Sequence, residues 1–136
     1  MDLDSAIAEL RTANEPVPLP MRLPTLDEVA AVESELGLQF HPDFRTYLLK
    51  ASDVVCGTIE PVTITIRDSH TDIRSVVANA RAMGVGPQLI PICEDNADFY
   101  CVTPEGEVVF WSHNGWAEEK WDSIAAWIEQ VWLESC

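Results

Sequence analysis

Residues 89–111, LIPICEDNADFYCVTPEGEVVFW, constrain the fold of this chain more than any other stretch. Two apolar runs, residues 99–102 and 108–111, flank a short polar segment. In that segment, Pro104 presets φ for the second position of a type I turn, and Gly106 tolerates the left-handed conformation that commonly follows. The pattern therefore predicts an antiparallel β-hairpin with a bulge.

A short apolar segment at residues 89–92 precedes the hairpin and contains Pro91. Because proline cannot donate a hydrogen bond to a ladder, we expect this strand at a sheet edge or at a bulge. A polar cluster follows, consisting of Glu94, Asp95, Asn96 and Asp98. A loop held between strands can present such charges to a partner, although Asp and Asn are also the usual residues of an ordinary solvated turn.

A second acidic segment follows the hairpin, where Trp116 stands beside Glu118 and Glu119. A tryptophan with an acidic rim is a plausible interface anchor. In an antiparallel pair, Phe99 and Trp111 lie at the same open end, so we expect the two acidic segments to lie close together. The predicted partner-binding residues are Glu94, Asp95, Asn96, Asp98, Trp116, Glu118 and Glu119.

The charge balance narrows the classes of partner. Eight basic residues stand against 23 acidic ones, for a net charge of −15, and Lys120 is the one base among ten acids from Cys93 onward. Such a surface repels nucleic acid and anionic membranes and attracts a basic protein. Acidity also serves solubility alone in many proteins.

Four further segments have helical apolar spacing: residues 3–10, 25–36, 42–51 and 73–83. Thr25 and Glu28 form a capping box, Pro42 suits a first helical position after a possible His41 cap, and Gly37 and Gly84 mark helix ends. A closing helix is expected after Asp122 as its cap, with Ile124, Trp127, Ile128, Val131 and Trp132 on one stripe.

Two segments are expected to be extended. Alternating apolar and polar residues at 62–67 predict a half-buried strand. Residues 16–24 hold four of the nine prolines and have no helical option. They can act as a proline-rich ligand, but a surface connector is the commoner role of such a segment.

Length and cysteine content predict one domain, residues 1–136, in a reducing compartment. No apolar run approaches the roughly 20 residues that span a bilayer. The first residues carry acids where a signal peptide needs bases, which predicts a cytoplasmic protein. The four cysteines form no CxxC pair, so we expect reduced thiols packed as small hydrophobic groups. A disulfide or metal role for Cys93 and Cys101, on adjacent strands, is the alternative.

No catalytic constellation emerges from the sequence. There is no glycine-rich phosphate loop, HExxH or GxSxG motif. Ser112 and His113 are adjacent, so on a strand they would point to opposite faces. Glu94 could form an acid pair with Asp98 or hold a divalent cation with Asp95, but the EF-hand spacing is missing. We therefore predict a non-enzymatic protein without cofactor or metal.

The order of motifs resembles the SUKH superfamily, which is similar to SMI1/KNR4 domains. The likeness covers about residues 25–133, after an N-terminal helix and proline-rich arm at 1–24. It rests on the helical segment FHPDFRTYLL at 40–49, the strand LIPI at 89–92, the polar loop and strand DNADFYCV at 95–102, the strand EVVFW at 107–111 and the closing helix at 124–133. The sequence departs from the family pattern after Leu49, where an Asn-Gly or Gly-Gly turn is usual.

The resemblance implies an α+β fold with a mostly antiparallel β-sheet and helices packed against it. Bacterial members are typically immunity proteins that bind and neutralise toxins, often nucleases, of polymorphic toxin systems, and other members are eukaryotic regulators of cell-wall synthesis. No shared catalytic site is established. The implied function is toxin neutralisation by an acidic binding domain. Two alternatives are a regulatory domain with an endogenous partner and a small hydrolase that uses Glu94, Asp95 or Asp98.

Overall fold

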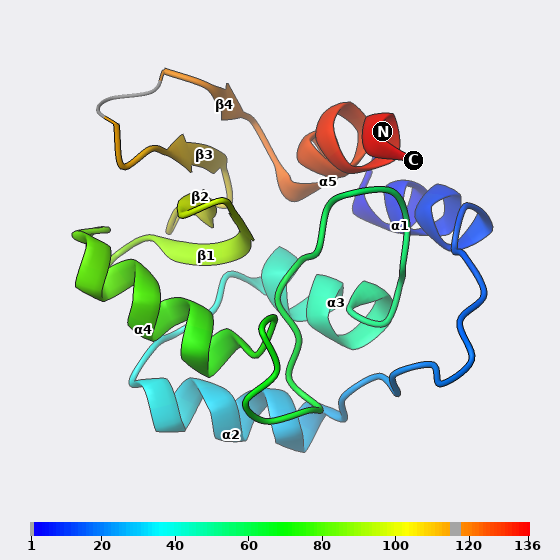
Figure 1. Cartoon of the computed structure of the whole chain (residues 1–136), viewed down its shortest axis with the longest axis horizontal. Coiled ribbons are helices and arrows are strands. Elements are labelled where there is room, and N and C mark those ends of the chain that lie inside the picture. The colour runs from blue at the N-terminus through cyan, green and yellow to red at the C-terminus, as the bar shows by residue number, and fades with distance from the viewer. Residues whose placement is uncertain (1, 115–117) are drawn as a thin grey trace.

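The computed structural model describes residues 2–114 and 118–136, which form an α+β domain (Figure 1). Four helices precede the sheet: α1 (Leu3–Thr12), α2 (Leu26–Leu36), α3 (Pro42–Ala51) and α4 (Ile73–Met83). Four strands follow: β1 (Ile90–Asp95), β2 (Asp98–Val102), β3 (Val108–Trp111) and β4 (Lys120–Trp121). A continuous helical segment closes the chain, comprising α5 (Ile124–Trp127), the π-helical η1 (Ile128–Trp132) and α6 (Leu133–Ser135).

The sheet is antiparallel with strand order β1-β2-β3-β4. The predicted hairpin is confirmed: Val102 lies opposite Val108, and Gly106 has a φ of 87° in the connecting turn. The expectation for Pro91 is also confirmed, because β1 is the first strand of the sheet and its register against β2 shifts between Pro91 and Cys93.

The two faces of the sheet are covered by different helices. On one face, Tyr100 of β2 contacts Phe110 and Trp121, and its ring centroid lies 5.5 Å from that of Trp127 in α5. The other face is closed by α4, which packs along β1 (Figure 1). Phe99 and Cys101 of β2 are fully buried. Helices therefore pack on both faces of the sheet.

The predicted ends of α2 and the predicted start of α3 are confirmed. Thr25 and Glu28 form the capping box of α2, and Gly37 ends that helix at a φ of 65°. His41 caps α3, since its Nδ1 accepts from the backbone N–H of Asp43. The helix α1 buries three apolar side chains against α3 and the closing helix, namely Ala6, Ile7 and Leu10.

The strand predicted at residues 62–67 is wrong. Val62 donates to the carbonyl of Ile92, but the segment then bends and makes only isolated bridges. The alternation fails at Ile66, which is 50% exposed although Ile64 is buried. The segment turns away because Thr63 pairs with Thr71, through a backbone hydrogen bond of 2.8 Å and contact of the two hydroxyl groups.

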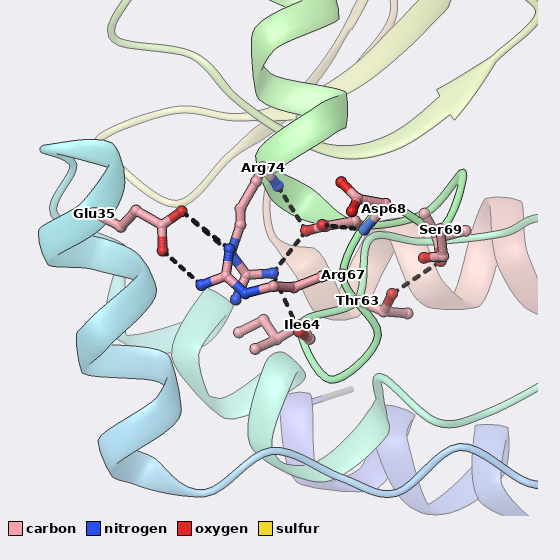
Figure 2. A network of polar contacts seen from close by, with 9 residues as sticks. Glu35, Thr63, Ile64, Arg67, Asp68, Ser69 and Arg74 are labelled. Atoms are coloured by element: carbon pink, nitrogen blue, oxygen red, sulfur yellow. Dashed lines mark hydrogen bonds and ion pairs between the residues drawn. The ribbon is translucent and has the colours of Figure 1, made fainter.

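A polar network replaces sheet pairing in holding this loop (Figure 2). Arg74 contacts Asp72 at 2.8 Å, and its guanidinium also donates to the carbonyl of Ile64. Glu35 of α2 faces both arginines of the network, with Arg67 at 3.1 Å and Arg74 Nε at 3.5 Å. The network thereby ties the loop and the start of α4 to α2.

The closing helix contains two corrections. Its cap is Ser123, whose hydroxyl accepts from the N–H of Ala126, and not Asp122. The expectation that all four cysteines are reduced is also wrong, because Cys56 and Cys136 form a disulfide across 80 residues. Trp132 supports that contact by donating from its indole N–H to the carbonyl of Cys56. Cys93 and Cys101 are buried free thiols, as expected.

Candidate functional site: an acidic end of the sheet

The polar cluster predicted as a loop is mostly part of the sheet. Glu94 and Asp95 end β1, Asp98 begins β2, and only Asn96 and Ala97 form the turn. Their φ values are 51° and 70°, as a two-residue hairpin turn of type I′ requires. Asn adopts this conformation readily, whereas Ala lacks a side chain that compensates its cost. The tight turn fixes Asp95 directly opposite Asp98.

One side of this turn borders a polar pocket of about 410 Å³. Glu94, Asp95 and Asn96 line it together with Glu60 and His70, whose side chains lie 2.8 Å apart. No sequence pattern groups Glu60 and His70 with this cluster. They come from the loop between α3 and α4, which reaches β1 at the bridge between Pro61 and Cys93.

The other side of the turn holds a hydrogen-bonded pair of side chains that the sequence did not reveal. Asp98 Oδ1 lies 2.7 Å from Nδ1 of His113 and accepts from the backbone N–H of the same residue. Partial burial acts to raise the pKa of Asp98, but these hydrogen bonds outweigh it and leave the pKa below its ordinary value. His113 thus pairs with Asp98 rather than with its neighbour Ser112.

The second acidic segment lies at the same end of the sheet. Phe99 is opposite Trp111, and the backbone N–H of Phe110 donates to the carbonyl of Glu119. The side chains of Glu118 and Glu119 are exposed. Lys120, expected to be the only base near this end, is instead engaged by Glu107 at 3.1 Å. Trp116 lies outside the described residues.

The pKa of Tyr100 shows that several carboxylates lie close together at this end of the sheet. Burial raises the pKa of Tyr100 to about 12, and the negative charges of Asp95, Glu119 and Asp98 add to the effect. Acids from β1, from β2 and from the segment before β4 therefore act on one phenol. We call the surface formed by Glu94, Asp95, Asn96, Asp98, Glu118 and Glu119 the acidic end.

The basic residues do not balance this charge. Among the described residues, seven of the eight Lys and Arg side chains pair with Asp or Glu, and Arg81 donates to three backbone carbonyls. These pairs engage seven of the 23 acidic side chains, and none of the seven belongs to the acidic end. The net charge of −15 is thus concentrated in carboxylates without a Lys or Arg partner.

The described part of the chain offers little for metal or thiol chemistry. No group of three or more His, Cys, Asp or Glu side chains within it could hold a metal ion. Burial raises the pKa of Cys93 and of Cys101 to about 12, so both remain thiols at neutral pH. Over the same residues, no helix has the length and hydrophobicity needed to cross a membrane.

The domain that carries the acidic end is similar to known proteins. Residues 3–133 match the family model SUKH_5, described as SMI1-KNR4 cell-wall. The chain is also similar to a crystal structure of a protein from Pseudomonas syringae pv. tomato, with a TM-score of 0.93 and 45% sequence identity over 97% of this chain and 99% of that one. No curated protein sequence matches the chain.

Proposed function

Because this chain belongs to the SUKH superfamily, we propose that it is a cytoplasmic immunity protein that binds and neutralises a basic toxin, such as a nuclease, of a polymorphic toxin system. SUKH domains are often immunity proteins, typically bind protein partners and are generally non-enzymatic. The proposal for this chain adds the absence of catalysis, the class of partner and the compartment.

The observation that carries the proposal is the engagement of every Lys and Arg among the described residues. The exposed acids of the acidic end therefore face solvent without competing cations. A nuclease must present a basic surface to hold phosphates, and an acidic inhibitor complements that surface. Complementary charge of this kind accelerates association and selects the partner.

Co-expression with the toxin encoded beside its gene tests the proposal directly. The expected result is survival of the host with this protein and death without it. Equal death in both cases removes the immunity function for that toxin. Purified toxin domain and purified protein should then form a complex whose association rate falls as salt rises.

Charge reversal tests whether the acidic end is the surface used. The double variant Glu94→Lys with Asp95→Lys should slow association and flatten its salt dependence, with little change in stability. The matched control is Glu129→Lys with Glu134→Lys, two exposed acids of the closing helix. Equal slowing by both double variants would assign the effect to net charge and not to this surface.

Trp116 remains a proposed anchor on the evidence of the sequence alone. We expect Trp116→Ala to weaken toxin binding by at least ~1 kcal/mol, as a moderate hot spot does. Isothermal titration measures the loss, and circular dichroism confirms that the variant is folded. An unfolded variant would mean that Trp116 belongs to the core.

A second candidate is a regulatory domain that binds an endogenous partner through its proline-rich arm. It is favoured by Leu19, which is 92% exposed at the centre of residues 16–24. Deleting residues 1–24 would remove the buried face of α1, so Leu19→Ser is the cleaner test. Retention of a partner in pull-downs with Leu19→Ser would argue against the arm.

A further inference from the structure

In the part of the chain that the structure describes, one face of the sheet is less covered over β3 than over β1 and β2. Successive residues of a strand point to opposite faces, so Val109 and Trp111 lie on the face opposite Phe110. That face is closed by α4 over β1, and both Phe99 and Cys101 of β2 are buried. Val109 and Trp111, in contrast, are only half-buried. The same face is thus packed at one edge and accessible at the other.

A groove of about 660 Å³ occupies this region. Its apolar lining includes Leu89, Val109 and Trp111. Trp111 is held in place by Phe99, with ring centroids 5.9 Å apart, so the lining is largely preformed. Pockets that bind small ligands or side chains commonly measure roughly 300–1,000 Å³ and are mostly apolar.

The rim of the groove is negatively charged. Glu118 and Glu119 contribute to it, and among the described residues neither pairs with Lys or Arg. Lys120 and His113 also line the groove, but the Lys120 ammonium is engaged by Glu107 and the His113 ring by Asp98. An apolar centre within an acidic border is complementary to an apolar side chain that has cations beside it.

We propose that this groove is the anchor site for the protein partner, and that it receives a large apolar side chain flanked by Lys or Arg. The inference rests on the proposed function and adds the chemistry of the bound segment. A second copy of this chain is a poorer occupant, because each copy carries a net charge of −15. Nucleic acid is excluded by the same charge.

Two synthetic heptapeptides test the groove without knowledge of the toxin. Both carry two lysines at each end; one has Leu-Trp-Leu at its centre and the other has Ser-Gly-Ser. In an amide NMR titration of the full chain, the apolar peptide should shift the resonances of Leu89, Val109 and Trp111. It should bind at least about tenfold more tightly than the control peptide, because it alone buries a large side chain.

Matched variants locate the binding. Val109→Lys places a cation in the groove and should abolish the difference between the peptides, whereas Leu19→Lys adds the same charge at a remote exposed site and should preserve it. If Val109→Lys does not fold, Glu118→Lys with Glu119→Lys serves instead and should reduce affinity for the apolar peptide. Equal affinities for both peptides, or an unchanged preference in the variants, would overturn the proposal.

The remaining outcomes separate the groove from the proposed function. A wild-type dimer in sedimentation that Val109→Lys dissociates would make the groove a self-association site and overturn the proposal. Equal protection against the toxin by wild type and Val109→Lys would also overturn the proposed anchor site, but it would leave the proposed immunity function intact. If the wild type gives no protection, the immunity function fails for that toxin, and the peptide titration still decides the groove.

Discussion

Removal of the Asp72 carboxylate is the most informative perturbation of the fold. Asp72 is 2% exposed and accepts three hydrogen bonds: from the backbone N–H of Arg74, from the guanidinium of Arg74 and from the backbone N–H of Asp68. It therefore caps α4, pairs with the partly buried guanidinium of Arg74 and holds the left-handed turn at Asp68. Arg74 also faces Glu35 of α2, whose carboxylate lies 3.5 Å from the Arg74 Nε atom (Figure 2).

The expected cost follows from these three roles. Loss of a helix cap costs about 1 kcal/mol. Breaking a buried ion pair by removing one partner costs about 3–5 kcal/mol. Glu35 and the carbonyl of Ile64 still contact Arg74 and offset part of that loss. We expect Asp72→Ala to reduce the free energy of unfolding by about 3–4 kcal/mol, which lowers Tm by about 10 °C for a domain of this size.

Urea denaturation, followed by the fluorescence of the buried Trp127 and Trp132, measures the loss. Asp27→Ala is the matched control, since Asp27 is an exposed acid in the first turn of α2, and it should change stability by less than about 0.5 kcal/mol. Asp72→Asn retains one acceptor and should fall between the two. A cost below about 1 kcal/mol for Asp72→Ala would refute the reasoning, because it would mean that Arg74 needs no partner.

Three further predictions concern other parts of the chain. Hydrogen bonds from Arg22 and from the backbone N–H of Thr25 lower the pKa of Glu28 from 4.5 to about 2. The stabilisation that Glu28 contributes is therefore complete above pH 4.5 and is lost as the pH falls towards 2. Glu28→Gln should remove this part of the acid dependence in unfolding curves measured at different pH values. Cys136→Ser removes a disulfide that spans 80 residues and should lower the free energy of unfolding by about 4–5 kcal/mol relative to the oxidised wild type. Equal stability would mean that the disulfide does not form, and intact mass spectrometry of the wild type checks whether it does. Gly106→Ala should lower the free energy of unfolding by about 1–3 kcal/mol because its Cβ would lie 2.6 Å from the His41 ring, whereas Gly37→Ala meets open space and should cost only about 1 kcal/mol.

Features coded within a few residues could be predicted from the sequence. The hairpin at 99–111 depends on Pro104 and Gly106, and the capping box depends on two side chains three residues apart. These residues determine the conformation of the backbone at their own positions, so the turn and the helix cap do not depend on contacts with distant parts of the chain. The shared end of the two acidic segments followed equally from the antiparallel register.

Features that depend on distant partners could not be predicted. The strand expected at 62–67 has the right alternation, but Thr63 is drawn to Thr71 and the loop closes on itself. Asp98 finds His113 only because β2 and β3 pair, and Cys56 finds Cys136 only after the closing helix has docked. The spacing of these residues in the chain gives no indication of such contacts.

The π-helical segment η1 has a consequence for how the closing helix tolerates changes of length. The N–H of Leu133 bonds to the carbonyl of Ile128, five residues back, so one turn contains an additional residue. Trp127 and Trp132, five positions apart, therefore contact each other at 6.1 Å as residues four apart do in an ordinary α-helix. Deletion of the exposed Gln130 would restore that four-residue spacing. We therefore expect the helix to tolerate the loss of this residue, with both indoles still buried and Cys136 still near Cys56. An insertion at the same place would widen a turn that already contains one additional residue, so we expect it to be tolerated less well.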